Sequence, residues 1–160
     1  MASCGQERNT VVTVEEFNRM MEEKSKKILD YVMRPSATQM INYIRNRVIN
    51  TGRSANRNLF SSYSDAYRKQ KSKRHPNVTF KNFSDTGIMW DRFGIQEEKN
   101  TLGYSVFIAR MDDGSRGDVT NQDLLEIHSD YERKELIAPS EQEIDLVNEA
   151  MNIRLQKLWA

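Results

Sequence analysis

The spacing of the apolar residues changes twice along this chain of 160 residues. It is helical near the N-terminus, alternating in the middle, and helical again near the C-terminus. A period near 3.6 is typical of an amphipathic helix, whereas alternation is typical of a strand with one buried face. We therefore predict an α+β domain, in which a small antiparallel sheet packs with N-terminal helices and a long C-terminal helix.

The first third of the chain predicts two helices. Thr13-Val-Glu-Glu16 has the spacing of a capping box, and Pro35 is expected to end the helix that starts there, because proline lacks a backbone N–H. Ser36-Ala-Thr-Gln39 repeats the capping pattern and predicts a second helix, which ends near Gly52. The apolar face of the first helix comprises Val14, Phe17, Met20, Met21, Ile28 and Val32.

Strands are predicted in the middle third, where β-branched and aromatic residues are common. The candidates are Val78–Phe80, Ile88–Ile95 and Leu102–Met111, separated by turn signals such as Asp112-Asp113-Gly114. The connections between them are too short to cross over between parallel strands, so we predict antiparallel pairing.

The last third returns to helical spacing. Asn121–Ser129 fits two helical turns, and Leu136–Ala138 fits a short final strand. Ser140-Glu-Gln-Glu143 is a third capping box, and it opens a helix whose apolar stripe continues to Leu158.

Length and composition limit the remaining possibilities. The chain is long enough for one core, so we predict a single domain at 13–160 after a flexible N-terminal tail at 1–12. The 24 Lys and Arg residues balance 23 Asp and Glu residues, so no long-range field attracts nucleic acid. The apolar runs are too short to span a bilayer, and residues 1–10 lack the apolar core of an export signal, so we expect no membrane partner.

The usual catalytic and metal-binding motifs do not occur in the sequence. Cys4 is the sole cysteine, and His75 and His128 are the only histidines, with no second ligand at metal-site spacing. The glycines are isolated, so there is neither a phosphate-binding loop nor a dinucleotide fingerprint. We therefore predict no enzyme activity, no metal and no cofactor.

A run of aromatic and basic residues in the centre of the chain is the sharpest local feature. The candidate contact residues for a partner protein or DNA are Tyr63, Tyr67, Arg68, Lys69, Lys71, Lys73 and Arg74. Basic side chains neutralise phosphates and aromatic rings stack on bases. A charge run is more often a solvated loop, an acidic protein surface is an equally good partner, and the two tyrosines also fit a packing role.

The same region resembles a family of phage proteins. The segment Leu59-Phe-Ser-Ser-Tyr63-Ser-Asp-Ala-Tyr67-Arg-Lys-Gln-Lys71, then Val78-Thr-Phe80 and Asp85-Thr-Gly87-Ile-Met89, is similar to the tailed-bacteriophage virion morphogenesis proteins. This family contains the tail-completion, or head-to-tail connector, proteins. The order of helix, motif, sheet and C-terminal helix also agrees, the last helix being introduced by Ala138–Glu141.

The resemblance implies a structural virion protein that forms a homo-oligomeric ring in the neck of the particle. Its implied partners are the portal or adaptor protein on one side and the tail tube or tail terminator proteins on the other. Contact with packaged DNA in the channel is also consistent with this place. The protein would lie in the virion, and in the host cytoplasm during assembly.

Two other hypotheses stay open at this level. Segment 68–74 fits a nucleic-acid-binding accessory module, whose binding would weaken steeply with salt. A small ribonuclease would use His75 as a general acid and base beside Lys73 and Arg74, but the sequence identifies no residue that would orient this histidine.

Overall fold

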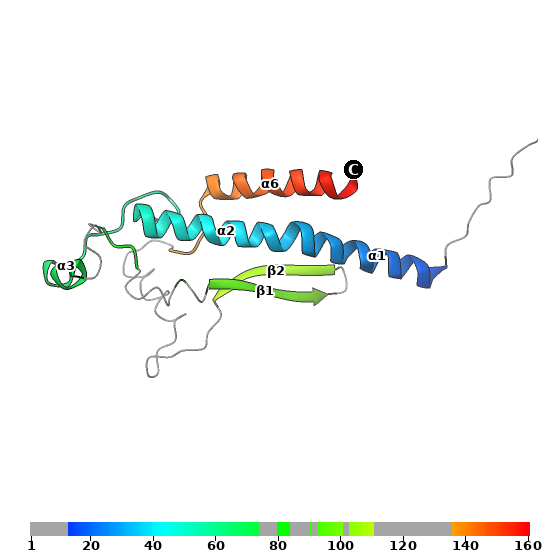
Figure 1. Ribbon diagram of the computed structural model, residues 1–160, viewed down its shortest axis with the longest axis horizontal. Coiled ribbons are helices and arrows are strands. Elements are labelled where there is room, and N and C mark those ends of the chain that lie inside the picture. The colour runs from blue at the N-terminus through cyan, green and yellow to red at the C-terminus, as the bar shows by residue number, and fades with distance from the viewer. Residues whose placement is uncertain (1–12, 74–79, 84–89, 91–92, 101–102, 111–135) are drawn as a thin grey trace, which may run out of the picture.

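One long helical run lies at the centre of the fold. The computed structural model describes residues 13–73, 80–83, 90, 93–100, 103–110 and 136–160. The run consists of α1 (Val14–Ile28), the π-helical segment η1 (Leu29–Met33), α2 (Arg34–Asn46) and the π-helical segment η2 (Arg47–Thr51) (Figure 1). Its start confirms the first capping box. The N–H of Glu16 donates to Thr13 Oγ1, and the N–H of Thr13 donates to Glu16 Oε2, each at 3.2 Å.

The helix continues through Pro35, so the prediction that it ends there was wrong. The N–H of Arg34 donates to the carbonyl of Leu29, five residues earlier, which widens the turn directly before the proline. Proline breaks a regular helix because its ring meets the preceding turn and its nitrogen cannot donate. A π turn relieves that crowding, and π turns and prolines are common causes of irregular helices. Ser36, predicted to cap a second helix, instead lies buried inside the run.

Gly52 ends the helical run, as predicted. Its φ of +62° is left-handed, a conformation that glycine adopts without steric cost. A Cβ atom at this position would lie only 2.3 Å from Cδ2 of Phe80, so the ring of Phe80 can approach the backbone only because the residue is glycine.

The sheet of the described residues is an antiparallel hairpin of β1 (Phe93–Asn100) and β2 (Gly103–Arg110). Phe93 lies opposite Arg110, and Asn100 lies opposite Gly103. The antiparallel pairing confirms the prediction, although β1 starts and ends later than Ile88–Ile95. Its second half is polar and exposed, so pairing with β2 rather than apolar alternation places it in the sheet.

Two other predicted elements differ from the structure. Leu136–Ala138 is irregular and forms no strand, since Leu136 is instead buried in the core. Phe80 lies in a bend, and the rest of its predicted strand lies outside the described residues. The predicted helix at Asn121–Ser129 and the predicted tail at 1–12 also lie outside them.

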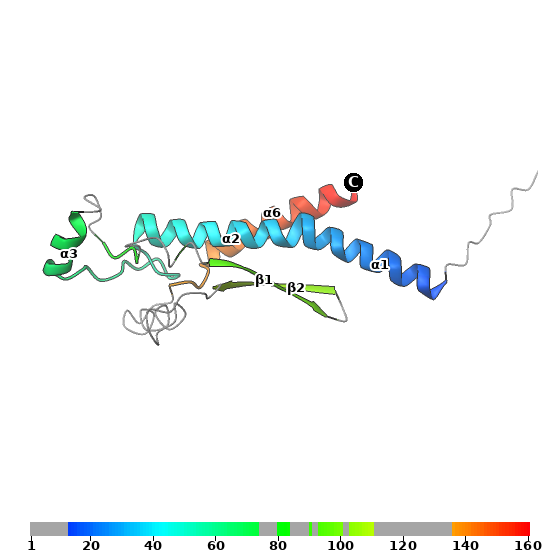
Figure 2. The ribbon, with the colours of Figure 1, turned by 60° about the horizontal axis from the view of Figure 1, so that its bottom comes forward.

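The C-terminal helix α6 (Glu141–Trp159) runs antiparallel to α2 and covers one side of the helical run (Figures 1 and 2). The hairpin covers the opposite side, so the helical run is the middle of three layers. The third capping box is confirmed at Ser140, whose Oγ accepts from the N–H of Glu143 at 3.3 Å. The α+β class is confirmed, but α6 packs on helices rather than on the sheet.

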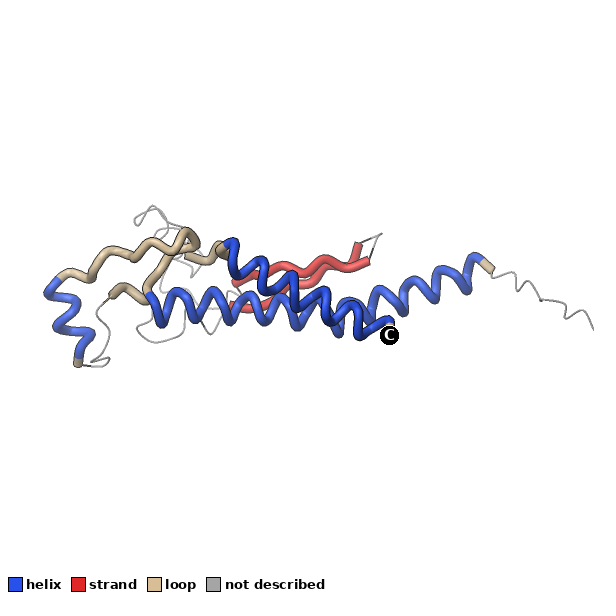
Figure 3. The backbone as a smooth tube through the Cα atoms, turned by 90° about the horizontal axis from the view of Figure 1, so that it is seen from above, coloured by secondary structure: helices blue, strands red, loops and turns tan. Residues whose placement is uncertain are grey.

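A short helix, α3 (Asp65–Ser72), stands at the opposite end of the molecule from the start of α1 (Figure 3). The core between this end and the hairpin is a cluster of Val48, Phe60, Trp90 and Leu136. These residues come from η2, the loop before α3, and two segments far along the chain. The core therefore joins the sheet-bearing part of the molecule to the end that carries α3.

Candidate functional site

The predicted cationic segment forms the helix α3 rather than a solvated loop. Ser64 is its N-cap, and its Oγ accepts from the N–H of Tyr67 at 3.4 Å. A serine at this position satisfies a backbone donor that the first turn leaves unpaired. The helix presents its residues on different faces, so the six described candidate contact residues do not form one surface.

Lys71 turns into the protein, where only 2 % of the residue is exposed. Its Nζ donates to the hydroxyl of Tyr63 at 2.7 Å and to Oδ1 of Asn82 at 2.6 Å, and it lies 4.5 Å from the centre of the Tyr63 ring. The N–H of Asn82 also donates to the Tyr63 hydroxyl, at 3.3 Å. We call Tyr63, Lys71 and Asn82 the buried polar anchor, because together they fix α3 to the segment that follows it.

The other aromatic residues of the motif pack beside this anchor. The ring of Tyr67 lies 4.9 Å from that of Tyr63, centre to centre, and stays partly exposed. Phe60 is buried and meets Phe83 edge to face at 5.0 Å. Phe60, Tyr63, Tyr67 and Lys71 belong to the first part of the phage-like motif, and in this structure that part is a packing unit. The rest of the motif, apart from Phe80, lies outside the described residues, at 78, 79 and 85–89.

Three of the remaining candidate residues lie on the outer side of α3 or directly after it. Arg68, Lys69 and Lys73 are exposed, and Arg68 Nη2 pairs with Asp65 Oδ1 at 2.6 Å. Arg74 lies outside the described residues. The structure thus brings Tyr63, Tyr67 and Lys71 together and leaves Arg68, Lys69 and Lys73 exposed. The spacing of 63, 67 and 71, one residue every four, is the sequence signal that separates the two groups.

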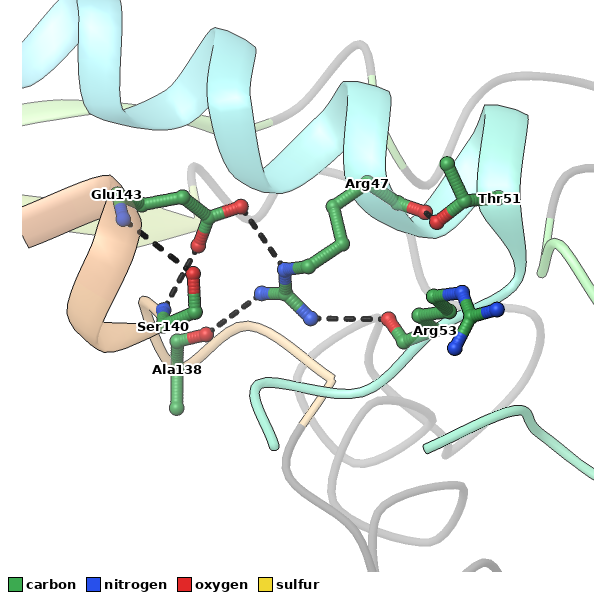
Figure 4. A network of polar contacts seen from close by, with 6 residues as sticks. All are labelled: Arg47, Thr51, Arg53, Ala138, Ser140 and Glu143. Atoms are coloured by element: carbon green, nitrogen blue, oxygen red, sulfur yellow. Dashed lines mark hydrogen bonds and ion pairs between the residues drawn. The ribbon is translucent and has the colours of Figure 1, made fainter. Parts of the chain in front are cut away.

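A second polar network, centred on Arg47, was missed by sequence reasoning (Figure 4). Nε of Arg47 donates to Glu143 Oε1 at 2.9 Å, and both side chains are buried. Its two terminal nitrogens donate to the carbonyls of Arg53, at 2.9 Å, and Ala138, at 2.7 Å. Glu143 also accepts from the N–H of Ser140 at 2.7 Å. No local pattern marks Arg47, because its partner lies 96 residues later.

This network uses Arg47 to join η2, the following loop and the start of α6. Each of its three nitrogens donates to an oxygen of the protein, which uses three of the five N–H donors of the guanidinium. Its role is therefore structural. Arg154 plays a similar part further along α6, where its Nη1 and Nη2 donate to Ser36 Oγ and Gln39 Oε1, each at 2.8 Å.

The clearest exposed apolar surface is at the start of α1. Val14, Phe17, Met20 and Met21 are 72 %, 56 %, 46 % and 47 % exposed. Their spacing places them on one side of the helix, so the predicted apolar face exists but its first two turns are not buried. We call these four residues the projecting stripe, because α1 extends past both neighbouring layers at this end (Figure 1).

Contacts next to the projecting stripe show where α6 and the hairpin stop covering α1. On the α6 side, Lys24 Nζ lies 5.6 Å from the centre of the Trp159 ring, at the end of α6. On the hairpin side, Lys99 Nζ pairs with Glu22 Oε1 at 2.5 Å. The hydrogen bond and charge of Lys99 lower the pKa of Glu22, and those of Glu22 raise the pKa of Lys99.

A further ion pair fixes the hairpin to the helical run. Arg34 Nη2 donates to Glu97 Oε2 at 2.7 Å, Arg34 Nε donates to the other oxygen of Glu97, and Arg34 also pairs with Asp30. This hydrogen bonding holds the pKa of Glu97 below its ordinary value. Both carboxylates are exposed, so these pairs position the hairpin more than they stabilise it.

The described residues contain no group of three His, Cys, Asp or Glu side chains placed to hold a metal ion. None of the described helices is both long and apolar enough to cross a membrane. The chain matches no protein-family model, no curated protein and no solved structure.

Proposed function

We propose that this chain is a structural virion protein, which forms a ring in the head-to-tail neck of a tailed bacteriophage and acts by docking to other proteins. The observation that carries the proposal is the projecting stripe on α1. Exposed apolar patches that are rimmed by polar residues commonly mark surfaces that other proteins cover. A neck protein needs surfaces of this kind, because its work is to hold two larger assemblies together.

The packing of the phage-like motif gives further support. Phe60, Tyr63 and Lys71 fix α3 to the core. A protein that docks through its α3 end needs such residues, because they hold that helix in place. Arg68, Lys69 and Lys73 then lie on the outside of a firmly held helix. A rigid helix holds docking residues more accurately than a loop does.

Quantitative mass spectrometry of purified particles of the source virus tests the proposal. We expect the chain in mature particles at a copy number equal to that of the portal protein or to half of it. Its absence from the particle would overturn the proposal. The portal protein itself is the internal standard, so the measurement depends neither on folding nor on the behaviour of the isolated chain.

A nucleic-acid-binding module is the second candidate, favoured by the three exposed cations on α3. Since Lys71 is buried, the binding residues would be Arg68, Lys69 and Lys73. We expect Lys69→Gln with Lys73→Gln to reduce the slope of log K against log salt by about 2, measured by fluorescence anisotropy with duplex DNA. A slope that does not change in this double variant would exclude the module.

A further inference from the structure

The two ends of the molecule carry opposite charge beside exposed apolar residues. At the start of α1, Glu15 and Glu22 flank one edge of the projecting stripe, and Glu16 and Glu23 flank the other. Residues seven apart on a helix lie nearly above one another, so each edge is a short acidic row. Glu22 is already paired with Lys99, so the stripe lies between Glu15 on one side and Glu16 and Glu23 on the other.

The opposite end is basic. We call its exposed cations the basic end: they lie on α3 and directly after it, and they are Arg68, Lys69 and Lys73. Tyr67, which is 36 % exposed, is a large aromatic residue beside them. Figure 1 shows that α3 and the start of α1 lie at the two extremes of the long axis.

We propose that the projecting stripe of one copy docks on the basic end of a second copy, so that the chain assembles head to tail. Complementary charge selects this partner, because two projecting stripes placed together would bring Glu15, Glu16 and Glu23 of one copy near the same carboxylates of the other. A contact between two different surfaces of one chain is heterologous, and it builds a ring when its rotation closes. This inference rests on the proposed function, since it names the two surfaces by which the neck ring would form.

Charge-reversal variants of the full chain test the inference by complementation. The stripe variant is Glu15→Lys with Glu23→Lys, which leaves the cap residue Glu16 and the paired Glu22 intact. The basic-end variant is Lys69→Glu with Lys73→Glu. Asp145→Lys with Glu149→Lys, on the exposed side of α6, is the matched control. Native mass spectrometry and light scattering give the oligomeric state at about 50 mM salt, where charge contacts are weakly screened.

We expect the wild type and the α6 control to form the same oligomer and each single-end variant to be monomeric. An equimolar mixture of the stripe variant and the basic-end variant should restore the oligomer, with the two chains alternating. Only a head-to-tail contact predicts that rescue. Circular dichroism confirms that each monomeric variant is folded.

Several outcomes would overturn the inference. They are a monomeric wild type, single-end variants that still assemble, or a mixture that stays monomeric. Loss of assembly in the stripe variant alone would indicate pairing of two α1 helices. If the basic-end variant still assembles but no longer binds duplex DNA, the basic end is a nucleic-acid-binding surface instead. The copy number in particles is a separate measurement, so it can support the neck assignment even when this docking mode fails.

Discussion

Lys71 and Lys69 lie two residues apart on α3, yet the first is buried and the second is exposed. Burial of an ammonium group requires partners that compensate for its lost hydration. Tyr63 and Asn82 supply two of them to Lys71. The charge of this lysine therefore serves the fold, whereas the charge of Lys69 is available to a partner.

Lys71→Met tests this assignment, because it keeps the apolar stem and removes the ammonium donor. We expect it to lower the free energy of unfolding by about 1–3 kcal/mol, since two buried oxygen acceptors lose their charged donor. Lys69→Met should change that free energy by less than about 0.5 kcal/mol. Urea titration followed by circular dichroism measures both, and equal effects of the two variants would contradict the buried polar anchor.

Arg47 gives a second prediction at the level of single residues. Arg47→Leu leaves the buried carboxylate of Glu143 without its cation, so we expect a loss of about 3–5 kcal/mol in the free energy of unfolding. Arg68→Leu is the control, because the partner of Arg68 is the exposed Asp65. The same urea titration applies. A loss at Arg47 no larger than at Arg68 would show that the network contributes little.

These two residues also show what the sequence could reveal about the candidate site. The position of Lys71 on the inner face of α3 follows from a local spacing of four residues, and that signal was present beside the charge run. The partner of Arg47 comes from long-range packing, which no pattern within a short segment encodes. Contacts of the second kind decide which charges are structural, so the charge run alone could not separate the two roles.

At the scale of elements, the hairpin is fastened to the helical run by exposed ion pairs. The pKa of Glu97 is lowered by Arg34, so the folded state binds protons less readily than the unfolded chain at this group. The resulting stability is present above the ordinary value of 4.5 and is lost as the pH falls through the lower folded-state pKa. The Glu22 pair with Lys99 follows the same direction.

Glu97→Gln should therefore lower the thermal unfolding temperature near pH 7 by at most about 4 °C. The difference from the wild type should shrink below pH 4.5 and vanish once Glu97 is protonated, because both side chains are then neutral. Thermal melts followed by circular dichroism across this range measure the effect. Glu98→Gln, on the same strand, is the control, and a difference that stays constant with pH would contradict the role of the ion pair.

Elements were predicted best where a local signal determines them. Thr13 and Ser140 start helices because their side chains satisfy backbone donors three residues later, and both were identified from spacing alone. Pro35 was misjudged because the widened turn before it has no signature in the sequence. The second half of β1 was missed for a related reason, since its place in the sheet depends on its neighbour.

At the scale of the whole molecule, burial separates the residues that hold the fold from those that we assign to docking. Phe17→Ser should change the free energy of unfolding by less than about 0.5 kcal/mol, measured under conditions in which the chain is monomeric, because Phe17 is more than half exposed. Ile44→Ala should lower it by about 2–5 kcal/mol, since Ile44 is fully buried. A large loss at Phe17 would show that this residue packs within its own chain.

The packing of α6 on α2 has a consequence for how the protein is made. Arg154 reaches back 118 residues to Ser36, so α6 is synthesised long after the surface of α2 on which it packs. A ribosome adds roughly 5–20 residues each second, so that surface waits several seconds for its partner. Until residues 141–159 have left the ribosome, the nascent chain exposes the side of α2 that α6 covers in the finished protein. Chaperones and proteases would meet the protein in that interval, and a nonsense mutation before Ser140 would make the exposure permanent.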